Sequence, residues 1–288
     1  MIKLNLGRNC LKVIIRTYGI KEIFIPYYSC KTIWQAIREE DCKIRFYHID
    51  KNFMPDCEFS KDSYILYINY FGLFAKNCKI LSDKYKNLIT DNTQAFYAPN
   101  FGLATFNSLR KFFPVQNGAY LQIEKEPKMN FETDNLKLKA GILCMQGDEI
   151  FRRHSEALAE ESPKQTTQND KYYINYEQFR QNELILNKEP IKLISAEVEK
   201  QMNDIDFESD KKRRIEMFNR YANEFGRYNL IKLPPLEDNI PYCYPLCTNN
   251  KEILQKLSGK TILRLWDDMP KSFPEYEFLY NVASLLCR

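Results

Sequence analysis

The sequence predicts an α/β protein in which helices sandwich a large, mainly parallel sheet, with a smaller α+β domain at the C-terminal end. Strand and helix patterns alternate through the first half of the chain, which is typical of layered α/β folds. A long amphipathic helix pattern, from Ser209 to Phe225, then leads into two further strand patterns. We therefore expect a large domain over residues 1–205 and a smaller one over residues 206–288.

Each expected element of the first half follows from its residue pattern. Residues 8–18 have the apolar spacing of a helix that Gly19 stops, and Pro26 closes a short apolar run at Ile23–Ile25. The same two criteria, helical spacing and short apolar runs, predict the rest in chain order: helix 30–39, strands 43–47 and 64–68, helix 76–86, and strands 88–90, 102–106 and 119–123.

The second half carries fewer structural signals. Residues 124–200 are polar, and the stretch Glu156–Lys171, with its charges, threonines and glutamine, predicts a surface loop. Beyond the helix expected at 209–225, the runs Tyr242–Leu246 and Ile262–Trp266 have the composition of strands.

Composition excludes several classes of protein. The 288 residues are 44% apolar and 14% aromatic, which indicates a globular chain. A net charge of +4, from 42 basic and 38 acidic residues, is too small to indicate nucleic-acid binding. The basic run Lys211–Arg214 is typical of a solvated helix start. No signal peptide is recognisable and no apolar run reaches the length of a membrane span, so we expect a cytoplasmic protein without membrane contact.

The nine cysteines are odd in number and scattered, which is typical of free thiols in a reducing compartment. Cys243 and Cys247 have a spacing that metal ligands use. The only histidines, His48 and His154, do not complete a tetrahedral set with them in sequence, so we expect no metal site.

The residues with the clearest chemistry are Asp91 and Lys111. The run Lys86–Thr90 reads as a buried strand that delivers Asp91 at its C-terminal end, where open α/β sheets bind ligands. A carboxylate there suits the protonated pyridine nitrogen of pyridoxal 5'-phosphate (PLP), and a lysine further along suits a Schiff base with its aldehyde. An amine reacts in its neutral form, which a neighbouring cation such as Arg110 favours.

These residues resemble a motif of the DegT/DnrJ/EryC1/StrS family of PLP-dependent sugar aminotransferases, which have fold type I. In that family an Asp is followed three residues later by Gln or His, as Asp91 is by Gln94. The family's lysine precedes a Gly-Gly pair by seven and eight residues, and here Lys111 precedes Gly118 and Ala119. The resemblance covers residues 4–123 well and includes Gly7 at the phosphate loop, the strand end Ile25–Ser29 and the turn Asn69–Gly72.

The resemblance implies a role for each matching residue. Lys111 is implied as the Schiff-base lysine that also carries the proton in transamination, and Asp91 as the partner of the ring nitrogen. Gln94 is implied as the donor to the phenolic oxygen of the ring. The backbone of Gly7, Arg8 and Asn9 precedes or opens a helix, where N–H groups bind phosphate well.

Two positions depart from the family pattern. The phosphate-binding hydroxyl normally lies five residues before the lysine, where this chain has Phe106, so either Thr105 or Ser108 is expected to replace it. In the family an aromatic residue stacks on the cofactor, and this chain has Cys30 at that position. Either Tyr27 or Tyr28 is therefore expected to stack instead. Our candidate stacking residue is Tyr28.

The resemblance implies an aminotransferase that moves an amino group from a donor such as glutamate to a nucleotide-linked keto sugar, working as a homodimer. Arg152, Arg153 and Asn182, in the polar middle, are candidates to reach a neighbouring subunit's site. A PLP-dependent dehydratase is one alternative, although such relatives replace the lysine with histidine. A non-catalytic paralogue that acts as a scaffold is the other, because the chain ends at Arg288, before the family's final Leu-Pro segment and helix.

Overall fold

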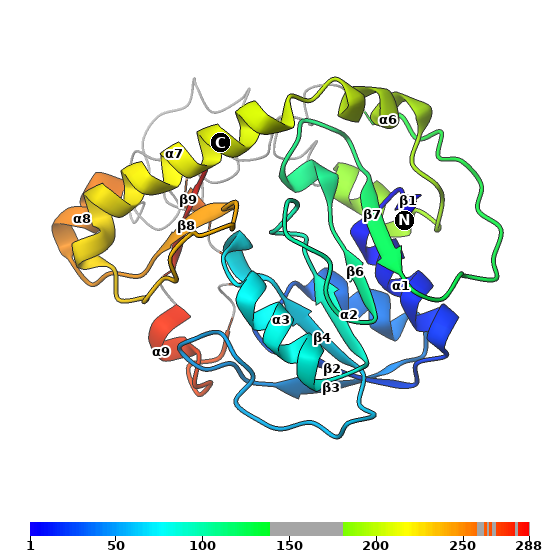
Figure 1. The fold of residues 1–288 in the computed structure, drawn as a ribbon, viewed down its shortest axis with the longest axis horizontal. Coiled ribbons are helices and arrows are strands. Elements are labelled where there is room, and N and C mark those ends of the chain that lie inside the picture. The colour runs from blue at the N-terminus through cyan, green and yellow to red at the C-terminus, as the bar shows by residue number, and fades with distance from the viewer. Residues whose placement is uncertain (139–180, 258–261, 264, 267–268, 280–281, 288) are drawn as a thin grey trace.

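A seven-stranded sheet forms the centre of the first half of the chain (Figure 1). The computed structural model describes residues 1–138, 181–257, 262–263, 265–266, 269–279 and 282–287. The spatial order of the strands is β1-β7-β6-β5-β4-β2-β3. In chain order they are β1 (Ile2–Leu4), β2 (Glu22–Pro26), β3 (Lys43–Tyr47), β4 (Ile65–Ile68), β5 (Leu88–Asp91), β6 (Ala104–Phe106) and β7 (Ala119–Ile123).

The pairing directions place a ligand edge at one end of this sheet. Strands β3, β2, β4, β5 and β6 are parallel, whereas β7 and β1 are antiparallel to their neighbours. Strand β5 is central and all four of its residues are buried, which explains its apolar start. Asp91 ends that strand, opposite Ile68 of β4 and Phe106 of β6. The loops after β2, β5 and β6 therefore meet at the same edge of the sheet.

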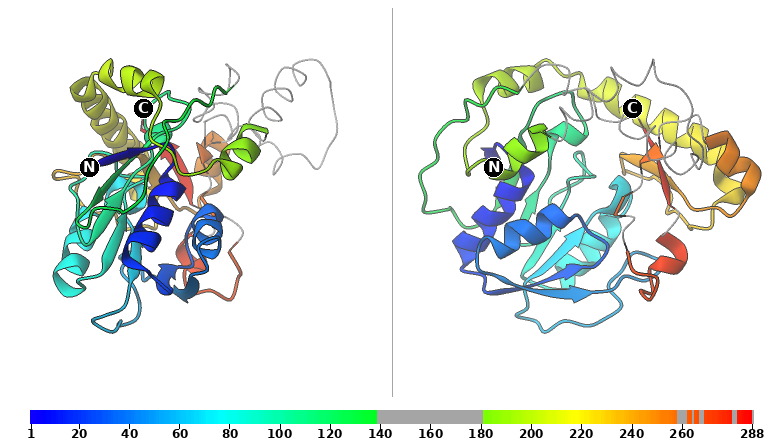
Figure 2. Two further views of the ribbon diagram at one scale, coloured as in Figure 1. Left: turned by 90° about the vertical axis from the view of Figure 1, so that its right-hand side faces the viewer. Right: turned by 180° about the vertical axis from the view of Figure 1, so that it is seen from behind.

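Helices cover both faces of the large sheet (Figures 1 and 2). Helices α1 (Gly7–Tyr18) and α2 (Lys31–Arg38) lie on one face, and α3 (Ala75–Lys84) lies on the other. Helix α1 turns its apolar residues into the core and ends where Gly19 adopts a left-handed conformation with φ of 64°. Two short 3-10 turns follow strands, η1 (Tyr70–Gly72) after β4 and η2 (Leu109–Lys111) after β6.

The C-terminal part contains a second, three-stranded antiparallel sheet. Its spatial order is β8-β10-β9. The long helix α7 runs between α6 and this small sheet (Figure 1). The division that we propose, between residues 205 and 206, falls between α6 and α7. The elements are α6 (Ala196–Asn203), α7 (Phe207–Phe225), η3 (Gly226–Tyr228), β8 (Cys243–Leu246), α8 (Lys251–Leu257), β9 (Ile262–Leu263), α9 (Tyr276–Leu279) and β10 (Ala283–Leu286).

Arg214 ties helix α7 to segments that follow strands of both sheets. The residue is 1% exposed and its guanidinium stacks on the Phe112 ring, with 4.4 Å between the guanidinium carbon and the ring centre. The guanidinium donates to the carboxylate of Asp210 (2.7 Å), to the Cys287 carbonyl (2.8 Å) and to the Phe112 carbonyl (2.9 Å). Because Phe112 follows Lys111 directly, this contact joins the helix to the segment that carries the predicted catalytic lysine.

The fold class predicted from the sequence is confirmed, and each helix and strand expected in residues 1–123 is present with small shifts of its ends. The helix expected at 209–225 and the strand expected at 242–246 are also confirmed. Strands β1 and β10 and helix α6 were not predicted. The loop expected at Glu156–Lys171 and the residues Arg152 and Arg153 lie outside the described residues.

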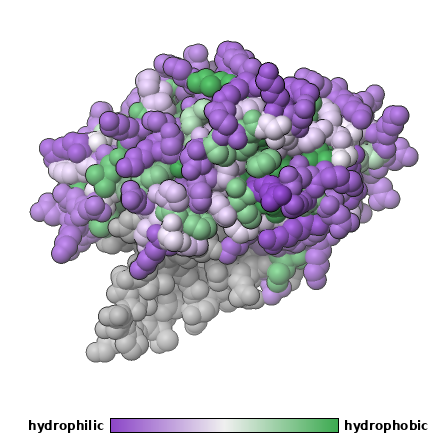
Figure 3. Space-filling model, turned by 90° about the horizontal axis from the view of Figure 1, so that it is seen from below, coloured by the Kyte–Doolittle hydropathy of each residue, from purple (hydrophilic) through white to green (hydrophobic). Residues whose placement is uncertain are grey.

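Polar side chains cover most of the face drawn in Figure 3, with smaller apolar groups between them. Among the described helices, none is both long enough and apolar enough to cross a membrane.

Candidate active site

A cavity of about 210 Å³ lies at the carboxyl edge of the parallel strands. Residues from the start of α1, the start of α2, the ends of β5 and β6, the η2 turn and two later segments form its wall. They are Leu6, Gly7, Arg8, Leu11, Cys30, Thr32, Ile33, Asp91, Thr93, Phe106, Ser108, Arg110, Lys111, Glu183 and Trp266. The cavity thus brings together five of the predicted residues: Gly7, Arg8, Asp91, Ser108 and Lys111.

Asp91 is the most buried ionisable group of the cavity wall. It is 2% exposed, and burial raises the pKa of its carboxyl above the ordinary value. The charge of Lys111 and hydrogen bonds from Thr93 oppose that rise. The Thr93 backbone N–H donates to Asp91 Oδ1 at 2.8 Å, which fixes one oxygen of the carboxyl group.

Thr93 also connects Asp91 to Lys111. The Lys111 Nζ atom donates to Thr93 Oγ1 at 3.1 Å, so one threonine touches both members of the predicted pair. Lys111 ends the η2 turn, which follows β6 and places the amine on the same cavity as the strand end. Thr93 lies inside the Asp91–Gln94 motif, but the sequence did not single it out.

Gly7 allows the first helix to approach the loop after β6. A Cβ atom at this position would lie 3.0 Å from the Asn107 carbonyl oxygen and 3.7 Å from Ser108 Cβ. Backbone N–H groups in the first turn of a helix have no partner within the helix, so those of Gly7 and Arg8 suit an anion. The Ser108 hydroxyl lies on the same wall. Together these groups have the chemistry of a phosphate site.

Asn9 and Thr105 do not line the cavity. Asn9 donates to Asn5 Oδ1 and to the Pro190 carbonyl, both at 2.9 Å, and therefore ties α1 to a later segment. The Thr105 hydroxyl is bonded to the backbone of Phe101. It lies on the opposite side of β6 from Phe106, because neighbouring side chains on a strand point to opposite faces. Of the two hydroxyls left open by the sequence, only that of Ser108 is on the cavity wall.

Tyr28 packs behind the cavity wall. It is 1% exposed, and its ring lies 4.7 Å from that of Trp266 in an edge-on arrangement. Trp266 itself lines the cavity, as does Cys30. Trp266 has φ of 52°, a left-handed conformation that is uncommon for a large residue. The aromatic ring on the wall therefore comes from the C-terminal part, where no motif in the sequence indicated it.

Gln94 is buried beside the cavity residues but is not on the cavity wall. Its Oε1 accepts from the Phe71 backbone N–H at 2.7 Å. Its Nε2 has no hydrogen-bond partner among the described residues. A buried amide donor normally has an acceptor, so a ligand oxygen would complete this group.

Gly118 packs against the turn that carries Lys111. Its φ is 108°, and a Cβ atom would lie 2.7 Å from Leu109 Cδ1 and 3.2 Å from Ile194 Cδ1. The Gly118 carbonyl accepts from the Leu109 backbone N–H at 2.9 Å. The residue therefore helps to shape that turn.

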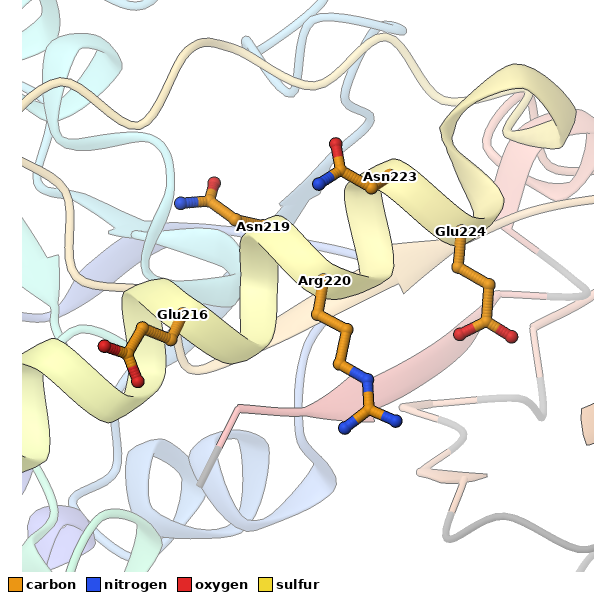
Figure 4. Close-up of a pocket in the computed structure, with 5 residues that line it drawn as sticks. All are labelled: Glu216, Asn219, Arg220, Asn223 and Glu224. Atoms are coloured by element: carbon orange, nitrogen blue, oxygen red, sulfur yellow. The ribbon is translucent and has the colours of Figure 1, made fainter.

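Another hollow, of about 620 Å³, lies along α7 (Figure 4). Its described lining comes from a single helix, and the labelled side chains of Asn219 and Asn223 extend from it in one direction while that of Arg220 extends in another. None of the predicted site residues contributes to it.

Comparison with solved structures shows that the chain has the fold of the type I PLP-dependent aminotransferases. Three of the matching structures, each with probability 1.00, show the range of the likeness. One is a DegT/DnrJ/EryC1/StrS aminotransferase from Brucella abortus (TM-score 0.56, 13% identity, covering 100% of this chain and 80% of that one). Another is DesV of S. venezuelae in complex with a ketimine intermediate (TM-score 0.60, 14% identity, 99% and 79% covered). NtdA from Bacillus subtilis, with bound cofactor PMP, is the third (TM-score 0.57, 14% identity, 99% and 68% covered).

Sequence comparisons gave no such match: neither a protein-family model nor a curated protein matches the chain. The resemblance in sequence therefore rests on the motif residues and their spacing within residues 4–123. The likeness to the solved structures is a likeness of fold.

Proposed function

We propose that this protein is a PLP-dependent aminotransferase of the DegT/DnrJ/EryC1/StrS type, which transfers an amino group from an amino acid such as glutamate to a nucleotide-linked keto sugar. The observation that carries the proposal is that Asp91 and Lys111 line one cavity and are joined through Thr93. The fold adds support, because DesV and NtdA share it and were solved with a ketimine intermediate and with PMP, respectively.

The residues of the cavity fit a pyridoxal group. A carboxyl, an amine, a hydroxyl and first-turn backbone N–H groups come from Asp91, Lys111, Ser108 and Gly7. The resemblance implies Gln94 as the donor to the phenolic oxygen of the ring; its buried Nε2 has no acceptor among the described residues, but the side chain is not on the cavity wall. When bound, PLP supplies an electron sink for the carbanion that forms next to the substrate nitrogen.

Each protein group then has one task. The Asp91 carboxylate holds the proton on the ring nitrogen, and Thr93 fixes that carboxylate through its backbone N–H. The Lys111 amine would hold the cofactor covalently and, as a free amine, would carry the proton of the transfer. Ser108 and the first turn of α1 would hold the phosphate, and Trp266 would supply an aromatic side chain on the cavity wall.

A chemical labelling experiment tests the role of Lys111. Reduction of the PLP-loaded protein with borohydride should attach the cofactor to Lys111, as peptide mass spectrometry would show. Lys111→Ala should lose this label and the transamination of glutamate while keeping its thermal transition. Lys79→Ala is the control, because Lys79 is exposed and paired with Asp83 on α3. A label on another lysine, or transamination by Lys111→Ala, would show that Lys111 is not the Schiff-base residue.

We also propose that the protein is a homodimer and works in the cytoplasm. Eight described cysteines are free, which supports a reducing compartment. The dimer rests on the resemblance, in which a neighbouring subunit completes the site. An obligate dimer buries well over roughly 2,000 Å². Sedimentation equilibrium should therefore give twice the chain mass at all accessible concentrations, and a stable monomer with full PLP occupancy would defeat the shared-site proposal.

A further inference from the structure

Two arginines of the cavity wall share one carboxylate. Arg8, at the start of α1, and Arg110, in the η2 turn, both contact Glu183, which lies in a helical segment over residues 181–188. Arg110 donates a short hydrogen bond to Glu183, and the Arg8 guanidinium lies 3.9 Å from the same carboxylate. Arg8 also donates to Asn187, four residues after Glu183. The two guanidiniums are therefore held side by side from a single helical segment.

Among the described residues of the cavity wall, cations outnumber carboxylates. They are Arg8, Arg110 and Lys111 against Asp91 and Glu183. The three members of the cluster are partly shielded from water, with side-chain exposures of 13% for Arg8, 25% for Arg110 and 27% for Glu183. Burial lowers the pKa of Arg8, Glu183 opposes that change, and the charge of Arg110 adds to it. Within the described part of the wall, the two guanidiniums thus share a single carboxylate.

We propose that Arg8 and Arg110 form a clamp for an oxyanion of the ligand, phosphate or carboxylate, and that Glu183 competes with this oxyanion for the two guanidiniums. A guanidinium binds such groups through two parallel N–H donors, which a lysine cannot do. The inference rests on the proposed function in taking the cavity as the ligand site. The oxyanion belongs either to the phosphate of the cofactor or to the substrate, and the clamp chemistry is the same for both.

The position of Glu183 separates this arrangement from an ordinary surface ion pair. Exposed ion pairs contribute little, and one exists nearby in sequence, where Arg16 binds Glu40 through two hydrogen bonds on the far part of α1. Glu183 instead bridges arginines from two different elements, and all three side chains face the cavity that holds Lys111 and Ser108. A carboxylate in that place has the charge and shape of the group that the ligand would supply.

Calorimetric titration with inorganic phosphate tests the clamp. Glu183→Gln removes the competing charge but keeps the size of the side chain, so it should bind phosphate about tenfold more tightly than the wild type. Arg110→Gln should lose most of the binding, and Arg110→Lys should recover only part of it because the planar fork is gone. Arg16→Gln, which breaks the exposed pair, should bind phosphate as the wild type does.

Equal phosphate affinity in the wild type and in Glu183→Gln would overturn the competition, and unchanged binding in both Arg110 variants would overturn the clamp. Thermal transitions identify any variant that fails to fold, and Arg110→Lys is the more conservative change. Saturation with PLP then identifies the source of the oxyanion. Loss of phosphate binding assigns the clamp to the cofactor's phosphate, whereas retained binding assigns it to the substrate.

The borohydride label on Lys111 keeps the two proposals apart. If the label is absent while Glu183→Gln still tightens phosphate binding, the aminotransferase proposal fails and the clamp stands. If the label is present while the phosphate affinities do not change among the variants, the clamp fails and the proposed function stands.

Discussion

The carboxyl group of Asp91 is buried in the folded protein, and burial disfavours its ionised form. Burial raises its pKa above the ordinary value of 3.8, although Lys111 and Thr93 act in the other direction. A group whose pKa is raised on folding binds its proton more tightly in the folded state. Its contribution to stability is therefore fully present below pH 3.8 and is lost as the pH rises through the raised pKa. Above the raised pKa, Asp91 therefore reduces the stability of the cofactor-free protein.

We predict that Asp91→Asn stabilises the cofactor-free protein at neutral pH by about 1 kcal/mol, because it removes a buried charge. An asparagine oxygen still accepts from the Thr93 backbone N–H. The same change should abolish transamination, since an amide does not hold the ring nitrogen protonated. Urea unfolding at several pH values measures the effect, which should vanish in acid. Asp83→Asn, at an exposed position paired with Lys79, is the control and should change stability by less than about 0.5 kcal/mol.

Residue spacing in the sequence indicates which chemical groups lie near the cavity. It does not indicate which of their side chains point into it. Asp91 and Lys111 follow from a strand end and a lysine at a fixed distance, and both are on the cavity wall. Thr105 and Ser108 are equivalent in sequence; in the structure Ser108 lies on the cavity wall, whereas the Thr105 hydroxyl bonds to the Phe101 backbone. Trp266 and Glu183 come from distant segments, so no local pattern connects them to Lys111.

At the scale of elements, the η2 turn depends on a glycine that follows it. Gly118 has φ of 108°, and its missing side chain leaves room for Leu109, which is fully buried and cannot move away easily. Leu109 and Lys111 belong to the same turn. The conformation of Gly118 therefore determines where the amine of Lys111 lies.

We predict that Gly118→Ala costs about 3 kcal/mol of stability, because it combines backbone strain with overpacking against Leu109. It should also reduce the borohydride label on Lys111. The matched control is Gly19→Ala at the end of α1, where φ is 64° and no atom lies within 4 Å of the added carbon. That change should cost about 1 kcal/mol and leave the label intact. Equal costs for the two variants, measured by urea unfolding, would contradict the packing argument.

The strands missed in the sequence are those whose formation depends on distant partners. Strand β1 has three residues and pairs with β7, and β10 forms the centre of the small sheet between β8 and β9. Such short segments carry too little periodicity to predict, because their pairing comes from tertiary contacts. The longer elements, such as α7, have a repeating apolar face and were predicted nearly to their ends.

At the scale of the whole molecule, Arg214 joins segments that follow strands of the two sheets. We predict that Arg214→Met lowers the free energy of unfolding by about 3–5 kcal/mol, because it leaves buried partners without their donor. Arg213→Met is the matched control. Arg213 binds the same Asp210 but its side chain is 54% exposed, so its loss should cost no more than about 1 kcal/mol. Similar costs in urea unfolding would show that the buried contacts of Arg214 contribute little.

The bonds of Asn5 and Asn9 to Pro190 have a consequence for how the protein is made. They span 185 and 181 residues, so both amides leave the ribosome long before their acceptor. At about 5–20 residues per second, translation separates the two events by roughly ten to forty seconds. The first helix, whose N-terminal turn we propose as the phosphate site, therefore reaches its final place late. The nascent chain must keep Asn5 and Asn9 hydrated until then, and the phosphate site that we propose cannot reach its final form before Pro190 has been made.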